Sequence, residues 1–229
     1  MAGVGGTSSG EPREVRVLIV SEHALVAEAV RAALSGRGCD PAVVRIGGRP
    51  PTGRHEVALL LTHSSSDQPF RALALLERMT IPWLVLASEE RGPTWGAFYS
   101  SGATLVLPPS ASLDDVCREL QALADGRRPS APRGRRELIR AWHQTLRERD
   151  ELSDRLSLLT ARERQVLREL HDGVGVRYIA QGSDVAEATV RTQVKAILRK
   201  LDVSSQIAAV AAYTQVRTEP AEDRRTNVP

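Results

Sequence analysis

Lysine is nearly missing from this sequence, because Lys195 and Lys200 are the only two in 229 residues. Arginine supplies almost all of the positive charge, and the formal net charge is only +3. A balance this close to neutral excludes a polycation that binds nucleic acid through overall charge, so any such binding must come from a local patch. Both lysines fall within residues 184–203, which makes that stretch the first candidate for such a patch.

Long apolar runs, a signal-peptide layout and a cysteine framework are missing as well. No run of about 18 apolar residues is present, and the chain starts with a polar, glycine-rich stretch. Cys39 and Cys117 form no metal-binding pattern and predict two buried, reduced thiols. We therefore expect a cytoplasmic globular protein without a membrane segment, with disordered tails at residues 1–14 and 218–229.

Residues 15–125 alternate between short apolar runs and amphipathic stretches. Continuous apolar runs such as VRVLIV and EVALLL suit strands that are buried on both faces. The predicted strands are 15–20, 41–46, 56–61, 82–87 and 103–107, and the predicted helices are 23–35, 68–79, 93–101 and 112–125. Segment 47–54 is too short and too rich in proline and glycine for a full helix. This order predicts an α/β domain whose five-stranded parallel sheet is covered by helices on both faces.

Helix 23–35 is expected to bury one side against this sheet. The apolar residues expected on that side are Leu25, Val26, Ala29, Val30, Ala33 and Leu34.

Residues 126–157 have the composition of a connection between domains. GRRPSAPRG (126–134) is typical of a linker, and 135–157 has leucines at helical spacing. Segment 127–150 holds eight arginines against three acidic residues. A helix of this length spans about 35 Å. Two interpretations stay open, a charged connector that packs on its own domain and a helix that pairs with a second copy.

Residues 158–217 have the pattern of four helices. Thr160 and Glu163 have the spacing of a capping box at the start of helix 160–171. A short helix at 177–181 and a tight turn lead into the helical stretch 184–203, and the last helix covers 204–216. In 184–203 the apolar stripe consists of Val190, Val194, Ile197, Leu198 and Leu201. The adjoining face has no carboxylate and carries Arg191, Thr192, Lys195 and Arg199.

The segments LTARERQVLRELHDGVGVRYIA, VAEATVRTQVKAILRKLDVSS and IAAVAAY resemble the LuxR/FixJ-type helix-turn-helix domain. The resemblance implies a small all-α domain that binds double-stranded DNA, often as a dimer, with its third helix in the major groove. Carried over by position, the groove-facing residues are Arg191, Thr192 and Lys195. The residues expected to contact phosphates are Thr189, Arg177, Arg199 and Lys200, although Lys200 lies on the far side of the helix from Arg191.

Three positions depart from the pattern of that family. Gln193 stands where a histidine is usual, Tyr178 where a glutamate is usual, and Ser183 where a leucine is normally buried in the turn. Ser183 should loosen the turn unless its hydroxyl caps the next helix. None of the three changes removes the basic face.

Segments VRVLIVSEHALVAEAVRAAL, IPWLVLAS and GATLVLPPSASLDDV resemble the receiver domain of response regulators of the same family. The resemblance implies a receiver-like (flavodoxin-like), doubly wound sheet over residues 15–125. A working receiver needs an aspartate nucleophile, an acidic pair for Mg²⁺, a hydroxyl and a lysine. In the same order, those positions hold Leu61 (to within one residue, among Leu60, Leu61 and Thr62), the pair Ser21 and Glu22, Ala87 (with Ser88 adjacent) and Pro109.

One carboxylate, that of Glu22, cannot assemble a phosphorylation site, so we expect no phosphoryl transfer. A slipped alignment would offer Asp67, but Asp67 begins a predicted helix and the domain contains no lysine. The crevice that Leu61, Ala87 and Pro109 would line is expected to be apolar. His23, His55 and His63 share no ligand spacing, so neither a metal nor a cofactor is predicted.

These patterns predict a sequence-specific DNA-binding transcriptional regulator, an atypical response regulator that acts without aspartyl phosphorylation, as a homodimer. Two alternatives stay open. The receiver-like domain could sense a small molecule or a regulatory protein, and the helix-turn-helix could mainly bind another protein. An enzyme is not expected, because no nucleophile, base and acid occur together in the pattern.

Overall fold

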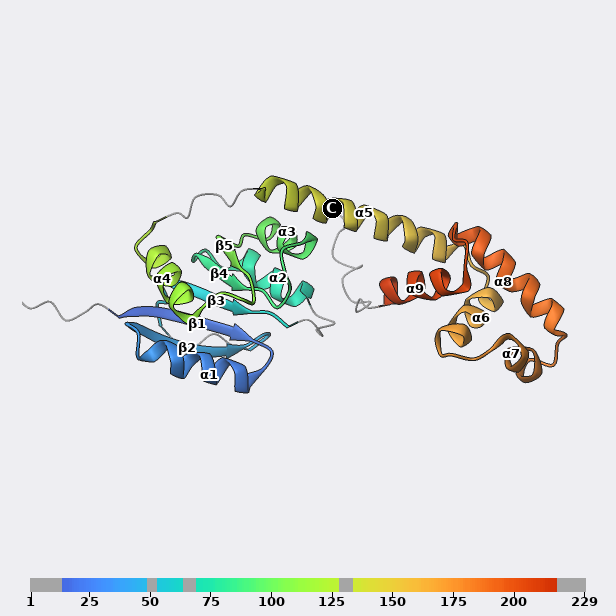
Figure 1. Ribbon diagram of the computed structural model, residues 1–229, viewed down its shortest axis with the longest axis horizontal. Helices are drawn as coiled ribbons and strands as arrows, with labels where there is room; N and C mark the ends of the chain where they lie inside the picture. The colour runs from blue at the N-terminus through green and yellow to red at the C-terminus, as the bar shows by residue number, and fades with distance from the viewer. Residues whose placement is uncertain (1–13, 49–52, 64–68, 128–133, 218–229) are drawn as a thin grey trace, which may run out of the picture. The chain divides into compact units, whose positions relative to one another are not determined.

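The computed structural model describes residues 14–48, 53–63, 69–127 and 134–217 (Figure 1). Residues 1–13 and 218–229 of the predicted tails, Asp67, and residues 128–133 of the predicted linker lie outside the described residues. The chain divides into two compact units, Met1–Trp142 and His143–Pro229.

The first unit is built on a parallel sheet in the order β2-β1-β3-β4-β5. Its strands are β1 (Val15–Ser21), β2 (Cys39–Arg45), β3 (Val57–Leu61), β4 (Trp83–Leu86) and β5 (Leu105–Leu107). Its helices are α1 (Ala24–Ser35), α2 (Pro69–Arg78), α3 (Pro93–Ser100) and α4 (Leu113–Ala124). None of the described residues between β2 and β3 is helical. The predicted five-stranded α/β fold is therefore confirmed.

Alternation along the strands divides the apolar residues between two cores. Leu18 and Val20 of β1 belong to the core that also contains residues of α2 and α3, whereas Val17 and Ile19 belong to the core beneath α1 and α4. These side chains are at most 2% exposed. Burying a side chain of this size contributes about 1.5–3 kcal/mol, so the two cores account for a sheet that is covered on both faces.

Helix α1 buries a narrower stripe than its sequence predicts. Ala27 and Leu34 are buried and Val30 is partly buried. Leu25 and Val26 are 84% and 49% exposed and Ala29 is also exposed, so the predicted burial of these three residues is wrong. Residues 27, 30 and 34 recur within an arc of about 60°, and Leu25 faces away from that arc. The stripe is thus narrower than a face drawn from hydrophobicity alone.

Both cysteines are free and buried, as predicted. Burial raises the pKa of Cys39 to about 11. A thiol with this pKa stays protonated near neutral pH and is a poor nucleophile.

Helix α5 (Arg135–Ser157) begins in the first unit and ends in the second. Leu138, Ile139 and Trp142 pack against the core of α2 and α3. The approach to α3 is close, because a Cβ placed on Gly96 would lie 2.0 Å from the carbonyl oxygen of Leu138 and 2.9 Å from the Cβ of Trp142. The division between the units therefore falls inside the predicted linker helix. No helix within the described residues is both long enough and apolar enough to cross a membrane.

The second unit contains α6 (Ala161–His171), α7 (Val176–Gly182), α8 (Glu187–Leu201) and α9 (Gln206–Arg217). The four helices match the predicted four-helix array. The predicted capping box is also confirmed, because the Glu163 N–H donates to Thr160 Oγ1 (3.2 Å) and the Thr160 N–H donates to Glu163 Oε2 (2.7 Å). The core shared by these helices includes Val166, Leu167, Ile179, Val190, Ile197, Leu201 and Ala209.

The contact between α3 and α5 predicts that Gly96→Ala destabilises the first unit by about 2–3 kcal/mol, because the new methyl group must displace the α5 backbone. Urea unfolding followed by tryptophan fluorescence measures this effect. Gly36→Ala is the matched control, since a Cβ there meets no atom within 4 Å. Equal stability of the two variants would contradict the described approach of α5 to α3.

Candidate nucleic-acid interface

Burial of one stripe determines which face of α8 points to solvent. Val190, Ile197 and Leu201 are each at most 1% exposed, and Val194 and Leu198 pack partly buried against the same core. These residues recur at the spacing of one helix face. The remaining faces of α8 are therefore the ones available to a ligand.

An exposed basic face lies beside this stripe. Arg191, Thr192, Lys195 and Arg199 are all exposed. The Arg191 guanidinium lies 3.4 Å from the Glu187 carboxylate, but exposed ion pairs of this kind are worth little, so the arginine can exchange this partner for another. The Thr192 hydroxyl donates to the Ala188 carbonyl (2.9 Å), which holds the side chain against its own helix.

The amino terminus of α8 lacks a side-chain cap. Its N-cap residue is Ala186, which has no polar side chain, and Thr189 in the first turn is exposed. The first N–H groups of a helix form a partial positive charge that attracts phosphate oxygens. Arg177 is exposed on α7, the helix that packs against α8. The structure thus brings Thr189 together with the basic face on one helix and puts Arg177 on its neighbour.

The turn between α7 and α8 departs from the sequence-based expectation. Ser183 ends α7 and does not cap α8. Its hydroxyl therefore does not offset the missing leucine by capping the next helix. The next residue, Asp184, adopts a left-handed conformation (φ 50°), which aspartate tolerates better than most residues. Val185 then donates its N–H to the Ala180 carbonyl (3.0 Å), which closes the turn through the backbone.

Lys200 does not belong to the exposed basic face, and its partners argue against its predicted role as a phosphate contact. Its ammonium donates to Glu163 Oε2 (2.7 Å) and to the Leu158 carbonyl (3.1 Å). Its side chain is 26% exposed and that of Glu163 is 10% exposed. A charge held in a part-buried pair is costly to release, so the lysine joins α8 to the start of α6.

Glu163 is therefore the centre of a small polar network. Burial raises the pKa of its carboxyl group, but hydrogen bonds from Lys200 and Thr160 outweigh burial and bring the pKa below its ordinary value. The network connects the capping box of α6 to the last turn of α8. The same end of α8 has a further contact, because Arg155 of α5 donates to the Leu201 carbonyl (3.4 Å).

The residues predicted to stand at the positions of a receiver's phosphorylation site lie at the carboxyl edge of the sheet in the first unit. Ser21 and Leu61 are neighbours in register on β1 and β3, and both are buried. Ala87 follows β4 and is buried, whereas Pro109 is exposed after β5. Leu61 and Ala87 belong to the cores on the two opposite faces of the sheet. They therefore stabilise the sheet by packing on its two faces.

Polar side chains also lie at this carboxyl edge, near Leu61 and Ala87, and the predicted apolar lining stays a prediction. The Ser88 N–H donates to Thr62 Oγ1 (2.8 Å), and the two hydroxyl oxygens are 3.3 Å apart. The His23 and His63 rings lie edge to face with centroids 4.4 Å apart. Among the described residues no group of three or more histidine, cysteine, aspartate or glutamate side chains could hold a metal ion.

Two of these arrangements were missed by reasoning from the sequence. The Glu163–Lys200 pair joins residues 37 positions apart, and the one available signal was that Lys200 lies opposite Arg191 on its helix. The pair of His23 and His63 joins the ends of β1 and β3. The order of the strands could have placed these two histidines side by side, because β1 and β3 are neighbours.

Both units of this chain are similar in sequence to known proteins. Residues 157–212 match the family described as GerE, bacterial regulatory proteins, luxR family. The nitrate/nitrite response regulator protein NarP of Escherichia coli is 30% identical over 230 aligned positions, which cover 90% of this chain and 98% of that protein. The probable transcriptional regulatory protein NarL of Mycobacterium tuberculosis is 29% identical over 223 positions, which cover 92% of this chain and 98% of that protein.

Solved structures of response regulators are also similar. The response regulator ChrA of a heme-sensing two-component system is 25% identical with a TM-score of 0.44, over 90% of this chain and 98% of that one. The response regulator RcsB in complex with DNA is 18% identical with a TM-score of 0.43, over 89% of this chain and 100% of that one.

The polar network predicts that Lys200→Met lowers the stability of α6 and α8 by about 2 kcal/mol, because the nearly buried Glu163 carboxylate loses its ammonium partner and keeps only the hydrogen bond from the Thr160 N–H. Hydrogen exchange of the α6 and α8 amides should accelerate by about 30-fold. Lys195→Met, on the exposed face, is the matched control and should change exchange little.

The same network has a pH dependence. Because the folded pKa of Glu163 is lowered, its stabilisation is complete above the ordinary pKa and is lost as pH falls through the folded value. The stability difference between the wild type and Lys200→Met should therefore shrink in acid. A difference that stays constant with pH would contradict the assignment.

Proposed function

The chain belongs to the luxR family of bacterial regulatory proteins, as a DNA-binding transcriptional response regulator of the NarL type, and we propose that α8 reads the DNA sequence while the first unit works without aspartyl phosphorylation. The observation that carries the proposal is the exposed basic face of α8, which the burial of Val190, Ile197 and Leu201 turns to solvent.

Three side chains of this face, those of Arg191, Thr192 and Lys195, have a chemistry that suits a base edge. Arg191 can donate two hydrogen bonds to guanine, and Lys195 can reach guanine or a phosphate. Thr192 has its hydroxyl engaged with Ala188, so its methyl group is the part suited to a thymine methyl. These three residues would specify the sequence.

Other groups would position the helix on the DNA backbone. Thr189, Arg177 and Arg199 are exposed, and the uncapped start of α8 adds N–H donors for a phosphate. Lys200 is left out of this set because Glu163 already holds its ammonium. Contacts of this kind carry affinity and salt dependence but no sequence information.

The residues at the carboxyl edge of the sheet support control without phosphorylation. Leu61, the residue that we assign to the position of the phosphorylated aspartate, is 7% exposed, within an apolar core. Of the acidic pair only Glu22 keeps a carboxylate, and Ala87 and Pro109 supply neither hydroxyl nor ammonium. The first unit would then act as a pseudo-receiver that keeps the fold of a receiver without its reaction.

We include a homodimer in the proposal. Ile207 of α9 is 83% exposed, which is unusual for an isoleucine on a helix that buries Ala209 and Ala212 on its other side. Pairing across this residue would present two copies of α8 to two half-sites.

Sequence readout predicts different effects for two arginines on α8, measured as equilibrium binding of the full chain to a duplex that carries its preferred sequence. Arg191→Ala should weaken binding by about 1–3 kcal/mol and relax the preference at one base pair. Arg199→Ala should weaken binding to all sequences alike and reduce the salt slope by about one. If both variants weaken all sequences equally, the division between base and phosphate contacts is refuted.

Loss of phosphorylation predicts that the full chain gains no phosphate when it is incubated with acetyl phosphate and Mg²⁺. Intact mass spectrometry reads the result, and a receiver that has its aspartate serves as the positive control. A stoichiometric gain of one base-labile phosphate would contradict the prediction, and Asp67, outside the described residues, would then be the first residue to replace.

A further inference from the structure

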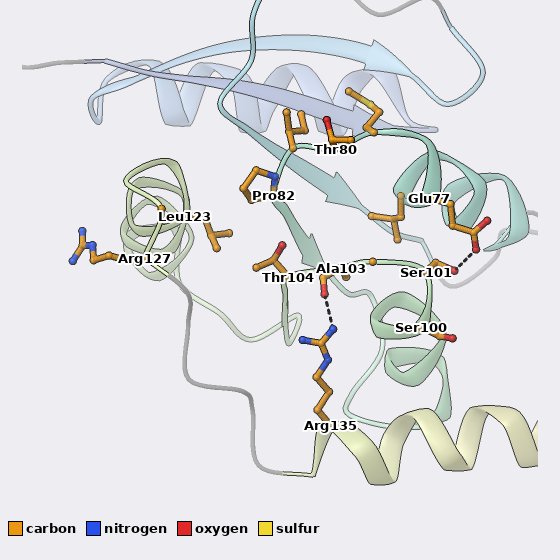
Figure 2. A pocket seen from close by; sticks show the side chains of 15 residues that line it. Glu77, Thr80, Pro82, Ser100, Ser101, Ala103, Thr104, Leu123, Arg127 and Arg135 are labelled. Carbon is orange, nitrogen blue, oxygen red and sulfur yellow. Dashed lines mark hydrogen bonds between the residues drawn. The ribbon is translucent and has the colours of Figure 1, made fainter.

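A cavity of about 900 Å³ opens at the amino ends of β4 and β5 (Figure 2). This edge of the sheet is opposite to the carboxyl edge, where the phosphorylation site of a receiver would lie. Its walls come from the end of α2, the segments that precede β4 and β5, the end of α4 and the start of α5. Leu76, Met79 and Leu123 give it apolar walls, and Thr80 and Thr104 give it hydroxyl groups. We call it the β4–β5 cavity. Its volume is typical of a site for a small molecule.

Arg135, the first residue of α5, brings a part-buried positive charge into this cavity. Figure 2 shows its side chain reaching from α5 toward Ala103. Its guanidinium lies 4.8 Å from the centre of the Tyr99 ring, and Nη2 lies 3.5 Å from the carbonyl oxygens of Tyr99 and Ala103. Burial raises the pKa of Tyr99, so that ring stays neutral.

The other charges at the β4–β5 cavity have partners. The Glu77 carboxylate accepts a hydrogen bond from the Ser101 hydroxyl (3.0 Å), and Arg127 pairs with Asp125 (3.1 Å). Among the described residues no carboxylate forms an ion pair with Arg135, whose partners are a ring and two carbonyl groups. Contacts of 3.5 Å are at the weak limit for hydrogen bonds, so they use little of the capacity of its five donors.

We propose that the β4–β5 cavity binds a small amphipathic organic acid, with its carboxylate on Arg135 and its apolar body against Leu76, Met79 and Leu123. A guanidinium presents a fork of donors that matches a carboxylate, and an apolar body would displace water from the apolar walls. Single acids fit better than polyphosphates, because only one cation in the cavity has no anionic partner.

Such a ligand would contact the first residue of α5. Arg135 is followed within two turns by Leu138 and Trp142, whose contact with Gly96 holds the start of α5 on the first unit. A carboxylate bound to Arg135 would add a contact at the beginning of the helix that ends in the second unit. The proposal does not rest on DNA binding, and its test contains no DNA.

Titration calorimetry of the full chain with sodium octanoate tests the proposal, with 1-octanol as the uncharged control. We expect one octanoate per chain, bound more tightly than 1-octanol. Arg135→Gln should weaken octanoate binding by about tenfold or more, because a charge-assisted pair is lost. Arg136→Gln, an exposed neighbour that does not line the cavity, should leave the affinity within about twofold of the wild type.

Two further variants keep the test decisive if Arg135→Gln does not fold. Arg135→Lys keeps the charge but loses the fork, so its affinity should be intermediate. Thr80→Phe adds bulk at an exposed position of the wall and should weaken binding without touching Arg135. The proposal is overturned if octanoate binding does not saturate or if 1-octanol binds as tightly as octanoate. It is also overturned if Thr80→Phe, Arg136→Gln and Arg135→Lys all bind octanoate with the affinity of the wild type.

Discussion

The burial of one apolar stripe on α8 is the constraint on which the second unit depends. Val190, Ile197 and Leu201 have no favourable place except the core they share with α6, α7 and α9. Once they are buried, the rotation of α8 about its axis is settled and the basic face must point to solvent. The pair of Glu163 and Lys200 adds a polar contact at one end of the helix, which opposes sliding along this core. The residues that orient α8 for DNA readout would thus be different from the residues that contact the DNA.

The stability of the first unit does not depend on the residues that a receiver needs for phosphorylation. Its two cores are made by alternating strand residues such as Leu18 and Ile19, which lie inside the sheet. A receiver performs its reaction with residues at or just after the carboxyl ends of the strands, and most of those positions can change without removing a core contact. Leu61 even adds to a core where an aspartate would have had to remain solvated. If the first unit works without phosphorylation, as we propose, its signal must arrive at another site, and the charge of Arg135 at the opposite edge of the sheet, for which the described residues offer no carboxylate partner, is one physical candidate.

Local patterns predicted much of this structure, and contacts between distant segments account for the rest. Alternation and helical spacing indicated the strands, the helices and the apolar stripe of α8, and the Thr160–Glu163 spacing predicted a cap that depends on four consecutive residues. The partner of Lys200 could not be read in this way, because its ammonium meets a carboxylate brought close only by the packing of α6 on α8. The same holds for Gly96, whose missing side chain matters only because α5 crosses α3 there. Hydrophobicity alone also placed Leu25 inward, since it cannot tell which part of a broad apolar face a sheet will cover.

Selection of the purified full chain on a pool of random double-stranded oligonucleotides tests the central claim most directly. If the basic face of α8 reads base edges, successive rounds should enrich one short motif, and a homodimer should enrich it as two related half-sites at a fixed spacing of about 10 base pairs or a multiple of it. If the chain binds DNA with no enriched motif, or does not bind DNA, α8 does not read sequence. The alternative of a helix-turn-helix that mainly binds another protein would then be favoured.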